Sequence, residues 1–588
     1  MMSSTLPAWN LKDLLRHPTK DSQRIEHELE SQVSSFERQR NRLTSGLSPQ
    51  PFQRILKQLE DISTQLNTLG AYGFLWFAEN TKNQTARAFD NHVRNRLAQF
   101  YPRLLFFDLW WQSLPPKQAS RLSSHATRHQ YYLDTLTRLS PHTLGESEER
   151  IVTLKNSTGR QALEALYGVT TNSLKFPLKH SGRTKQLTRE ELMSYVRHPS
   201  ASVRRGAYQS LFKVYGAQRD ILGDLYKHLV QDWGNEGLQL RKYSSPIAVR
   251  NTANDLPEAA VDALLGTCRK NANVFQQYFR LKQRLLKLKT FHRYDLYAPY
   301  GGKSRRYTFA RAERMVIEAY QSFSPALADQ ASRVIREQHL DAVIRPGKMG
   351  GAFCYSVRPK QTPYVLVNFT GEARDVSTLA HELGHAVHAM LAENHSVLTF
   401  HSALPLAETA SIFGEQLLSD SLLTQEHDPT TKVSLLLSQL DDLYATIMRQ
   451  AFFVLFEREA HRMIGQGTTI DELAEGYLTL LREQFGRDIK VGEEFRWEWL
   501  AIPHIFGSPF YCYSYSFGNL LVLALFQQYK KEGKPFIPKY IELLAGGGSA
   551  SPKALLTPLG VDVSSRKFWQ GGFTRIQSLV NQLDQHMP

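Results

Sequence analysis

The sequence predicts a mostly α-helical protein with a small β-sheet directly before one histidine-rich helix. Three long stretches, 87–111, 259–289 and 434–464, place apolar residues three and four positions apart over many turns, which is the period of an amphipathic helix. Strand-like sequence is scarce, and its clearest example is the β-branched, apolar run TPYVLVNFT at 362–370. We therefore expect helices over most of the chain and strands mainly around that run.

The length of 588 residues bounds the number of domains. A domain typically has roughly 100–200 residues, so about two to four domains or lobes are expected. Breaker-rich stretches occur at 45–52, 297–304 and 545–552, and no internal repeat stands out. We expect an N-terminal helical region over 1–199 and a main region over 200–588.

The composition, 42% hydrophobic and 22% charged residues, is typical of a globular protein. The longest apolar run, LLVLALF at 520–526, is far shorter than the ~20 residues of a membrane-spanning helix. The first residues show no secretion signal. Cys268, Cys354 and Cys512 form neither a CxxC metal pair nor a disulfide framework. We therefore expect a cytoplasmic protein with no membrane partner.

The net charge of +15 raises the question of an anionic partner, because such a surface can attract nucleic acid, membrane or acidic peptides. The densest basic stretch, RLKQRLLKLK at 280–289, alternates cations with leucines at helical spacing, which is typical of a solvated helix face. No RNA-binding or helix-turn-helix signature accompanies it. We expect no nucleic-acid partner, and the charge alone identifies no other.

The run TLAHELGHAVHAML at 378–391 carries the clearest chemical signal in the chain. His381 and His385 are four residues apart, so on a helix both imidazoles project from one face toward the same point, as a zinc ion requires. Glu382 is the next residue, near enough to act on a water molecule at the metal without being a ligand itself. The pattern predicts a metal site with a neighbouring general base.

A histidine-rich structural helix is the competing interpretation of this run. It is disfavoured because imidazoles that lack partners are costly in a core. Gly384 costs roughly 1 kcal/mol relative to alanine inside a helix, and close approach of another backbone or helix would explain it. The opposite stripe of the helix is apolar and is expected to pack into the core: Val376, Leu379, Leu383, Val387 and Met390.

The third ligand must come from outside this run. The extended motif with a third histidine would need glycine at 388 and histidine at 391, but the chain has His388 and Leu391. His388 is therefore expected to be a packed, hydrogen-bonded histidine, because a catalytic zinc keeps one position open. The candidates downstream are Glu393, His395, His401, Glu408 and Glu415.

Glu408 is the preferred third ligand. Glu393 and His395 lie at the expected end of the histidine helix and would have difficulty folding back, whereas Pro405 starts a new amphipathic helix at 405–423. Glu408 and Glu415 lie seven residues apart on one face of that helix, and a buried carboxylate needs a metal or a cation to offset desolvation. Glu415 would orient a ligand histidine. An exposed helix charge is the alternative for each of them.

Together these residues resemble a known family. TLAHELGHAVHAML followed by LAETASIFGEQ resembles the oligoendopeptidase F and thimet oligopeptidase family of zinc metallopeptidases, and is closest to the oligoendopeptidase F branch. The likeness covers nearly the whole chain in the family's order, with further matching segments at 291–300, 351–371, 504–518 and 560–569, and weaker ones at 198–208 and 249–257.

The resemblance implies two largely helical lobes around a deep substrate channel, with one Zn²⁺ on its floor. It also implies cleavage of short peptides, since a folded protein would not enter such a channel. Matched residue by residue, it supports His381, His385 and Glu408 as ligands and Glu382 as the catalytic carboxylate.

The resemblance also draws attention to the tyrosine-rich segment PHIFGSPFYCYSYSFG at 503–518. In the family, a histidine and a tyrosine of this segment contact the substrate and stabilise the oxyanion. Tyr513 fits that tyrosine and His504 fits that histidine, although the loop between them is shorter than in the thimet-like branch. Tyr511 could contact substrate or pack. Composition alone would favour aromatic packing for the whole segment.

A peptide could also add to the expected strand. The run PYVLVNF at 363–369 could bind peptide backbone by strand addition, with Gly350 and Gly351 allowing close approach.

The sequence thus predicts a zinc-dependent endopeptidase, a peptide hydrolase in which Glu382 activates water at the metal to cleave internal bonds of short oligopeptides. A zinc carboxypeptidase or dipeptidyl carboxypeptidase on the same metal site is one alternative. A basic helical binding protein with a structural metal is another, disfavoured because a structural zinc has no use for Glu382. Side-chain preference and oligomeric state are not predicted.

Overall fold

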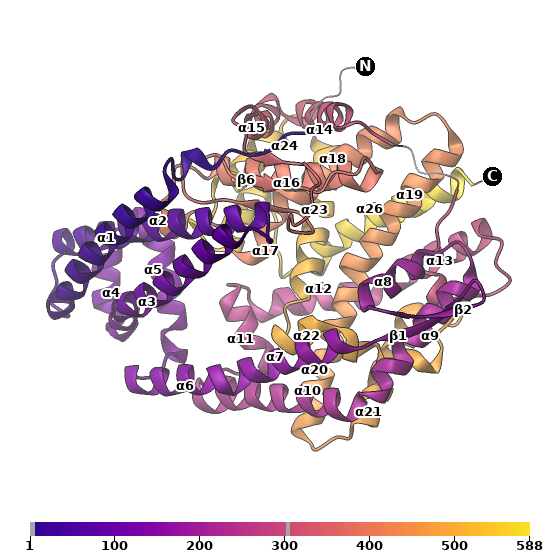
Figure 1. The fold of residues 1–588 in the computed structure, drawn as a ribbon, viewed down its shortest axis with the longest axis horizontal. Helices are drawn as coiled ribbons and strands as arrows, with labels where there is room; N and C mark the ends of the chain where they lie inside the picture. The colour runs from indigo at the N-terminus through magenta and orange to yellow at the C-terminus, as the bar shows by residue number, and fades with distance from the viewer. Residues whose placement is uncertain (1–5, 302–305, 588) are drawn as a thin grey trace. The chain divides into compact units, whose positions relative to one another are not determined.

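The structure, a computed structural model, describes residues 6–301 and 306–587. Helices form most of this part of the chain, and its strands are short and few (Figure 1). The predicted fold class, mostly α with a small sheet next to the histidine helix, is confirmed. Among the described residues, no helix combines the length and the apolar character that crossing a membrane requires.

The chain divides into two compact units. Unit 1 comprises 1–140, 303–422 and 528–561, and unit 2 comprises 141–302, 423–527 and 562–588. Each unit combines segments that are far apart in the sequence. The units therefore do not coincide with the regions 1–199 and 200–588, which stay a prediction about sequence regions.

Unit 1 holds the N-terminal helices, the histidine helix and its neighbours. Its helices are α1 (Pro18–Glu37), α2 (Pro49–Glu79), α3 (Gln84–Ser113), α4 (Pro116–Ser123), α5 (Gln130–Leu139), α14 (Phe309–Phe323), α15 (Pro325–Arg336), α16 (Ala373–Leu391), α17 (Leu404–Ala407), most of α18 (Thr409–Gln425), α24 (Phe536–Ala545) and α25 (Pro552–Leu556).

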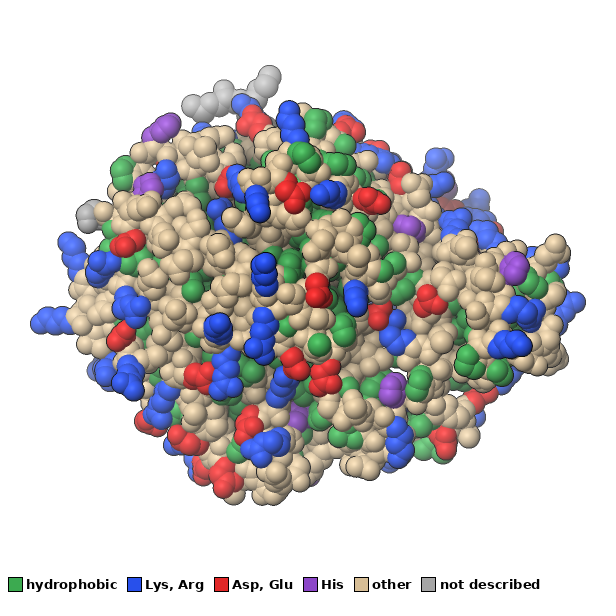
Figure 2. Space-filling view, turned by 180° about the vertical axis from the view of Figure 1, so that it is seen from behind, with side chains coloured by type: hydrophobic (Ala, Val, Ile, Leu, Met, Phe, Trp, Pro, Cys, Tyr) green, Lys and Arg blue, Asp and Glu red, His purple; other side chains and the backbone are tan. Residues whose placement is uncertain are grey.

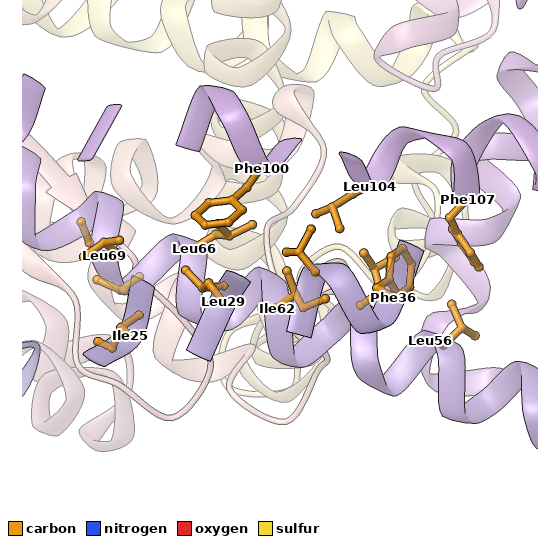
Figure 3. Close-up of a cluster of buried hydrophobic side chains, with 14 of the residues drawn as sticks. Ile25, Leu29, Phe36, Leu56, Ile62, Leu66, Leu69, Phe100, Leu104 and Phe107 are labelled. Carbon is orange, nitrogen blue, oxygen red and sulfur yellow. The ribbon is translucent and has the colours of Figure 1, made fainter. Parts of the chain in front are cut away.

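The first three long helices of unit 1 enclose an apolar core. Apolar residues at helical spacing on α1, α2 and α3 point toward one another, as Figure 3 shows for Leu29, Leu66 and Phe100. Their side chains are almost fully removed from water. The predicted amphipathic stretch 87–111 lies within α3, and its apolar stripe explains why that helix packs here.

A three-stranded sheet precedes the histidine helix. Its order is β4 (Leu340–Asp341), β6 (Tyr364–Leu366) and β5 (Phe353–Tyr355), with β4 parallel and β5 antiparallel to the central β6. The predicted strand run is thus correct in place, although only three of its residues pair as a strand. Both β5 and β6 pack against α16.

Unit 2 is built of helices and two small two-stranded sheets. The strands are β1 (Phe176–His180) with β2 (Arg183–Leu187), antiparallel, and β3 (Phe291–His292) with β7 (Ile489–Lys490), parallel. Its helices are α6 (Glu146–Thr158), α7 (Arg160–Ser173), α8 (Arg189–Ser194), α9 (Ala201–Ala217), α10 (Arg219–Gly234), α11 (Pro246–Ala253), α12 (Glu258–Lys270), α13 (Ala272–Leu285), α19 (Pro429–Leu443), α20 (Arg449–Gly465), α21 (Ile470–Phe485), α22 (Pro503–Gly507), most of α23 (Tyr513–Glu532) and α26 (Arg566–Gln585).

Two predicted helices differ from expectation in their continuity. The stretch 259–289 breaks into α12 and α13 at Asn271, whose side-chain amide bonds back to the Thr267 carbonyl (2.9 Å) and so ends the first helix. The stretch 434–464 forms α19 and α20, joined by a π-helical turn at Tyr444–Met448.

The basic charge is dispersed on the face that Figure 2 shows. Lys and Arg side chains lie scattered over it, with Asp and Glu side chains among them. Unit 2 also contains buried ion pairs, such as Arg204 with Asp295 (2.6 Å) and Lys282 with Asp441 (2.6 Å). Some of the basic side chains therefore pair with buried carboxylates inside unit 2.

Candidate metal centre

The helix α16 carries the two histidines of the motif, and its start is fixed by the loop that leaves the sheet. Asp375 Oδ2 accepts hydrogen bonds from the backbone N–H groups of Thr370 (2.7 Å) and Glu372 (3.1 Å). The predicted apolar stripe, including Leu379, Leu383 and Val387, is buried. The opposite face presents the imidazoles, as the four-residue spacing requires.

Gly384 permits a close contact between α16 and α18. A Cβ at this position would lie 2.6 Å from Ser411 Cα and 2.7 Å from the Ala410 carbonyl oxygen. Neither atom can give way, because both belong to the backbone. The expectation that another backbone approaches this glycine is confirmed, and the approach brings the start of α18 against the motif.

Glu408 lies at a break between two helices. We expected one helix over 405–423, but α17 ends at Ala407 and α18 begins at Thr409, so that prediction is wrong. Ser411 Oγ donates to both the Glu408 carbonyl (3.0 Å) and its carboxylate Oε2 (2.8 Å). These bonds compete with the helical pattern and hold the carboxylate in place.

The three predicted ligands converge. Nε2 of His381 and Nε2 of His385 are 3.2 Å apart, and each lies 3.3 Å from Glu408 Oε2. A tetrahedral ion about 2.0–2.1 Å from each ligand atom would separate those atoms by roughly 3.3 Å. The spacing therefore fits a zinc-sized ion. Among the described residues, this is the group of three metal-binding side chains whose ligand atoms come together.

Glu415 lies behind His381 rather than at the convergence point. Its Oε1 is 2.5 Å from His381 Nδ1. A carboxylate there fixes the tautomer that leaves Nε2 free to bind a metal. Although burial disfavours its charge, the two histidines hold the pKa of Glu408 well below its ordinary value, so this ligand carries a negative charge.

Glu382 lies next to the ligands without being one of them. Only 6% of the residue is exposed, and this burial raises the pKa of its carboxyl group above the ordinary value. It lines a pocket of about 440 Å³ together with His381, His385 and Glu408. A carboxylate with a raised pKa beside a metal site is suited to taking up and releasing a proton.

Three other histidines that the sequence singled out lie outside the ligand set. His388 is 8% exposed, and burial lowers its pKa to about 4, so its imidazole is neutral at pH 7. His401 lines the same pocket, and burial lowers its pKa as well. His395 bonds to the Ala545 carbonyl (2.7 Å). The packed role that we expected for His388 agrees with its burial.

Comparison with known proteins identifies the family. The model of peptidase family M3 matches residues 194–574, and that of oligopeptidase F matches residues 110–176. This chain belongs to peptidase family M3. The expected family and the expected enzyme class, a metalloendopeptidase, are thereby confirmed.

Relatives of this M3 peptidase align over most of its length. Oligopeptidase PepF of Bacillus subtilis is 26% identical over 86% of this chain and 76% of its own. An oligoendopeptidase F homolog of Borreliella burgdorferi is 26% identical over 88% of each chain. The solved structure of a putative peptidase from Chlamydophila abortus has a TM-score of 0.88 at 24% identity, covering 98% of both chains. That of oligoendopeptidase-F from Enterococcus faecium has a TM-score of 0.71 at 20% identity, covering 97% of this chain and 99% of its own. These structures share its fold.

The two glycines before β5 differ from each other. Gly351 has φ +79°, a conformation that favours glycine, and Gly350 does not, but a Cβ at either position would meet no atom within 4 Å. Asn368 Nδ2 donates to the Gly351 carbonyl (2.8 Å) and ties this turn to the segment after β6. The run 363–369 contains β6, which is the central strand and is paired on one side by β4 and on the other by β5, so the prediction that a peptide adds to this run is wrong.

The tyrosine-rich segment belongs to unit 2. Tyr513 is fully buried, and its hydroxyl oxygen accepts a hydrogen bond from Asn254 Nδ2 (2.7 Å). His504, Tyr511 and Tyr515 are partly exposed instead. The Tyr515 hydroxyl lies 3.4 Å from His504 Nε2. Sequence reasoning missed Tyr515, and the alternation of tyrosines at 511, 513 and 515 offered no signal to separate buried from exposed members.

Proposed function

We propose that this M3 peptidase holds one zinc ion with His381, His385 and Glu408 and hydrolyses internal bonds of short oligopeptides. The convergence of two imidazole nitrogens and one carboxylate oxygen at 3.2–3.3 Å is the observation that carries the proposal. Two nitrogens and one oxygen with an open fourth position form a donor set typical of catalytic zinc. Zinc in this site would polarise the scissile carbonyl and lower the pKa of a water molecule to ~7.

Glu382 would move the protons of the reaction. Its carboxylate takes a proton from the attacking water and then delivers it to the departing amine nitrogen, so one group serves as base and then acid. Its burial beside the ligands supports this role, because a raised pKa brings the group closer to the operating pH. Glu415 meanwhile holds His381 in the ligating orientation.

Donors to the developing oxyanion would come from the tyrosine-rich segment. Tyr513, the candidate from the sequence, can serve only after its side chain leaves the buried contact with Asn254. His504 and Tyr515 present their polar atoms at partly exposed positions without such a change. A single donor of this kind is commonly worth about 3–4 kcal/mol in the transition state.

An exopeptidase on the same metal site is the rival function. It would need a cation that grips a free C-terminal carboxylate. Among the described residues that line the pocket at the metal site, there is no Lys or Arg. This favours cleavage of internal bonds. Cytoplasmic localisation and the absence of a nucleic-acid partner stay predictions.

The decisive variant is Glu382→Gln, which keeps the shape of the side chain and removes its basicity. We expect unchanged folding and zinc content, with hydrolysis of an internally quenched peptide reduced by a factor of about 10² or more. His381→Ala is the matched variant, for which zinc content and activity should fall together. Undiminished turnover by Glu382→Gln would reject this mechanism.

A further inference from the structure

The tyrosine-rich segment contains a strained turn. Phe510 has φ +59°, a left-handed conformation that a bulky L-residue rarely adopts. Its side chain is buried against His461, with ring centroids 4.7 Å apart. Such a conformation persists only where the surroundings fix it, and it often accompanies a functional site.

Polar side chains from two helices of unit 2 hold this turn. Glu457 on α20 accepts a hydrogen bond at Oε1 from the Phe510 backbone N–H (2.7 Å). Arg250 on α11 donates from Nε to the Pro509 carbonyl (3.1 Å), and Asn254, just after α11, bonds to the Tyr513 hydroxyl. Three hydrogen bonds therefore hold the segment, at Pro509, Phe510 and Tyr513.

Glu457 is the unusual member of this set. It is fully buried, and its Oε2 has no hydrogen-bond partner among the described residues. Burial raises its pKa to about 8, so the carboxyl group is mostly protonated at pH 7. Burying a carboxyl group whose oxygen lacks a hydrogen-bond partner costs free energy, and the proposed proton transfers do not use this group.

The held turn leads directly into the partly exposed aromatic groups. Tyr511 stacks parallel to His504, with ring centroids 6.0 Å apart, and Tyr515 lies edge-on to both at 5.8 Å from His504 and 5.3 Å from Tyr511. Because Tyr511 is the next residue after Phe510, a change of the Phe510 backbone would swing it out of this arrangement.

We propose that Glu457 is a positioning residue: by accepting the Phe510 N–H it holds the turn that sets Tyr511 and Tyr515 against His504 for a peptide substrate. This rests on the proposed peptidase function. Glu457 touches neither substrate nor metal ligands in this role, and acts only through the segment that it fixes.

Two variants separate the effect of side-chain length at position 457 from the effect of its carboxyl group. Glu457→Gln keeps the acceptor oxygen at the same reach and is neutral, as the protonated acid is. Glu457→Asp keeps the acid and withdraws the oxygen by one methylene. We expect Glu457→Gln to retain kcat within about twofold, and Glu457→Asp to lose about tenfold or more in kcat with KM changed less than about twofold.

Controls distinguish positioning from loss of stability. Asp441→Asn weakens the buried pair with Lys282 elsewhere in unit 2, so it should lower Tm and leave the kcat of the folded enzyme unchanged. Zinc content should match the wild type in all three variants. Wild-type kcat in a folded, zinc-loaded Glu457→Asp variant would overturn the inference, as would an equal loss in Glu457→Gln. An active Glu382→Gln variant would instead reject the proposed function.

Discussion

Glu415 and Glu382 lie close to the same histidines and have different environments. Glu415 Oε1 contacts Nδ1 of His381, the nitrogen that points away from the ligand cluster, whereas Glu382 lines the pocket at the metal site. The two carboxylates therefore have different proposed roles. Glu415 orients the ligand His381, and Glu382, in the pocket, exchanges protons.

Removing the Glu415 carboxylate should weaken metal binding. We expect Glu415→Ala to lose about 10–100-fold in zinc affinity, because the His381 ring is then free to turn and to change tautomer. Competition with a chelator of known affinity measures this. Glu393→Ala removes a carboxylate two residues after the end of α16, outside the ligand cluster, and should bind zinc as the wild type does. Equal affinities in both variants would contradict the orienting role.

The burial of Glu457 should appear in the pH dependence of stability. Burial raises the pKa of this carboxyl group from 4.5 to about 8 on folding. The folded state therefore binds the proton more tightly, and the free energy of unfolding falls as pH rises between these two values, by up to about 1.4 kcal/mol per pH unit.

Glu457→Gln has no such proton to lose. The Tm of the variant relative to wild type should rise from about pH 5 to about pH 8 and then level off. Thermal unfolding in a series of buffers measures the difference. A Tm difference that is constant across this range would show that Glu457 is ionised in the folded protein or exposed to water.

The contact between α16 and α18 brings Glu408 to the two histidines. It depends on Gly384, where the α18 backbone fills the space of a side chain, and on Gly414, where a Cβ would clash with the Tyr320 hydroxyl. The Tyr320 hydroxyl in turn donates to the Ala380 carbonyl (2.9 Å), directly before His381. Gly384, Gly414 and the buried Tyr320 side chain therefore determine the distance between α16 and α18.

Gly384→Ala should therefore cost both stability and metal. Alanine favours a helix interior by about 1 kcal/mol, but its Cβ would force the α18 backbone away and pull Glu408 from the histidines. We expect a lower Tm and a substoichiometric zinc content. Gly168→Ala, on α7 where a Cβ meets nothing within 4 Å, should instead raise Tm slightly. Equal stabilisation by both substitutions would contradict the close contact.

The sequence was sufficient for features that depend on local periodicity. The apolar stripes predicted the helices, and the spacing of His381 and His385 predicted that their imidazoles share a face. The break at Glu408 was missed because it depends on the bonds from Ser411, and the break at Asn271 because an asparagine in a helical pattern is compatible with either outcome. The burial of Tyr513 depends on Asn254, far away in the sequence, so no local pattern reveals it.

Metal ligands and the tyrosine-rich segment belong to different compact units of the molecule. The ligands lie within 381–408 of unit 1, whereas His504 and Tyr515 belong to unit 2. Because the two sets belong to different compact units, variants at Glu457 and at Glu415 should affect different measured quantities: kcat at constant zinc content in the first case, and zinc affinity in the second.

Endopeptidase activity should not depend on the chain ends of the substrate. We expect one oligopeptide with a free and with an amidated C-terminus to be cleaved at the same internal bond with kcat/KM values within about threefold. Mass spectrometry of the products identifies the bond. Loss of cleavage by orders of magnitude on amidation would show that a cation grips the terminal carboxylate, as in a carboxypeptidase.

We propose that His381, His385 and Glu408 hold one zinc ion. Anomalous diffraction at the zinc absorption edge, from crystals of the zinc-loaded protein, would locate that ion. We expect one strong peak per chain, about 2.0–2.2 Å from the Nε2 atoms of both histidines and from a Glu408 carboxylate oxygen. A peak ligated by Glu415 or Glu382 instead of Glu408, or no peak at the two histidines, would contradict it.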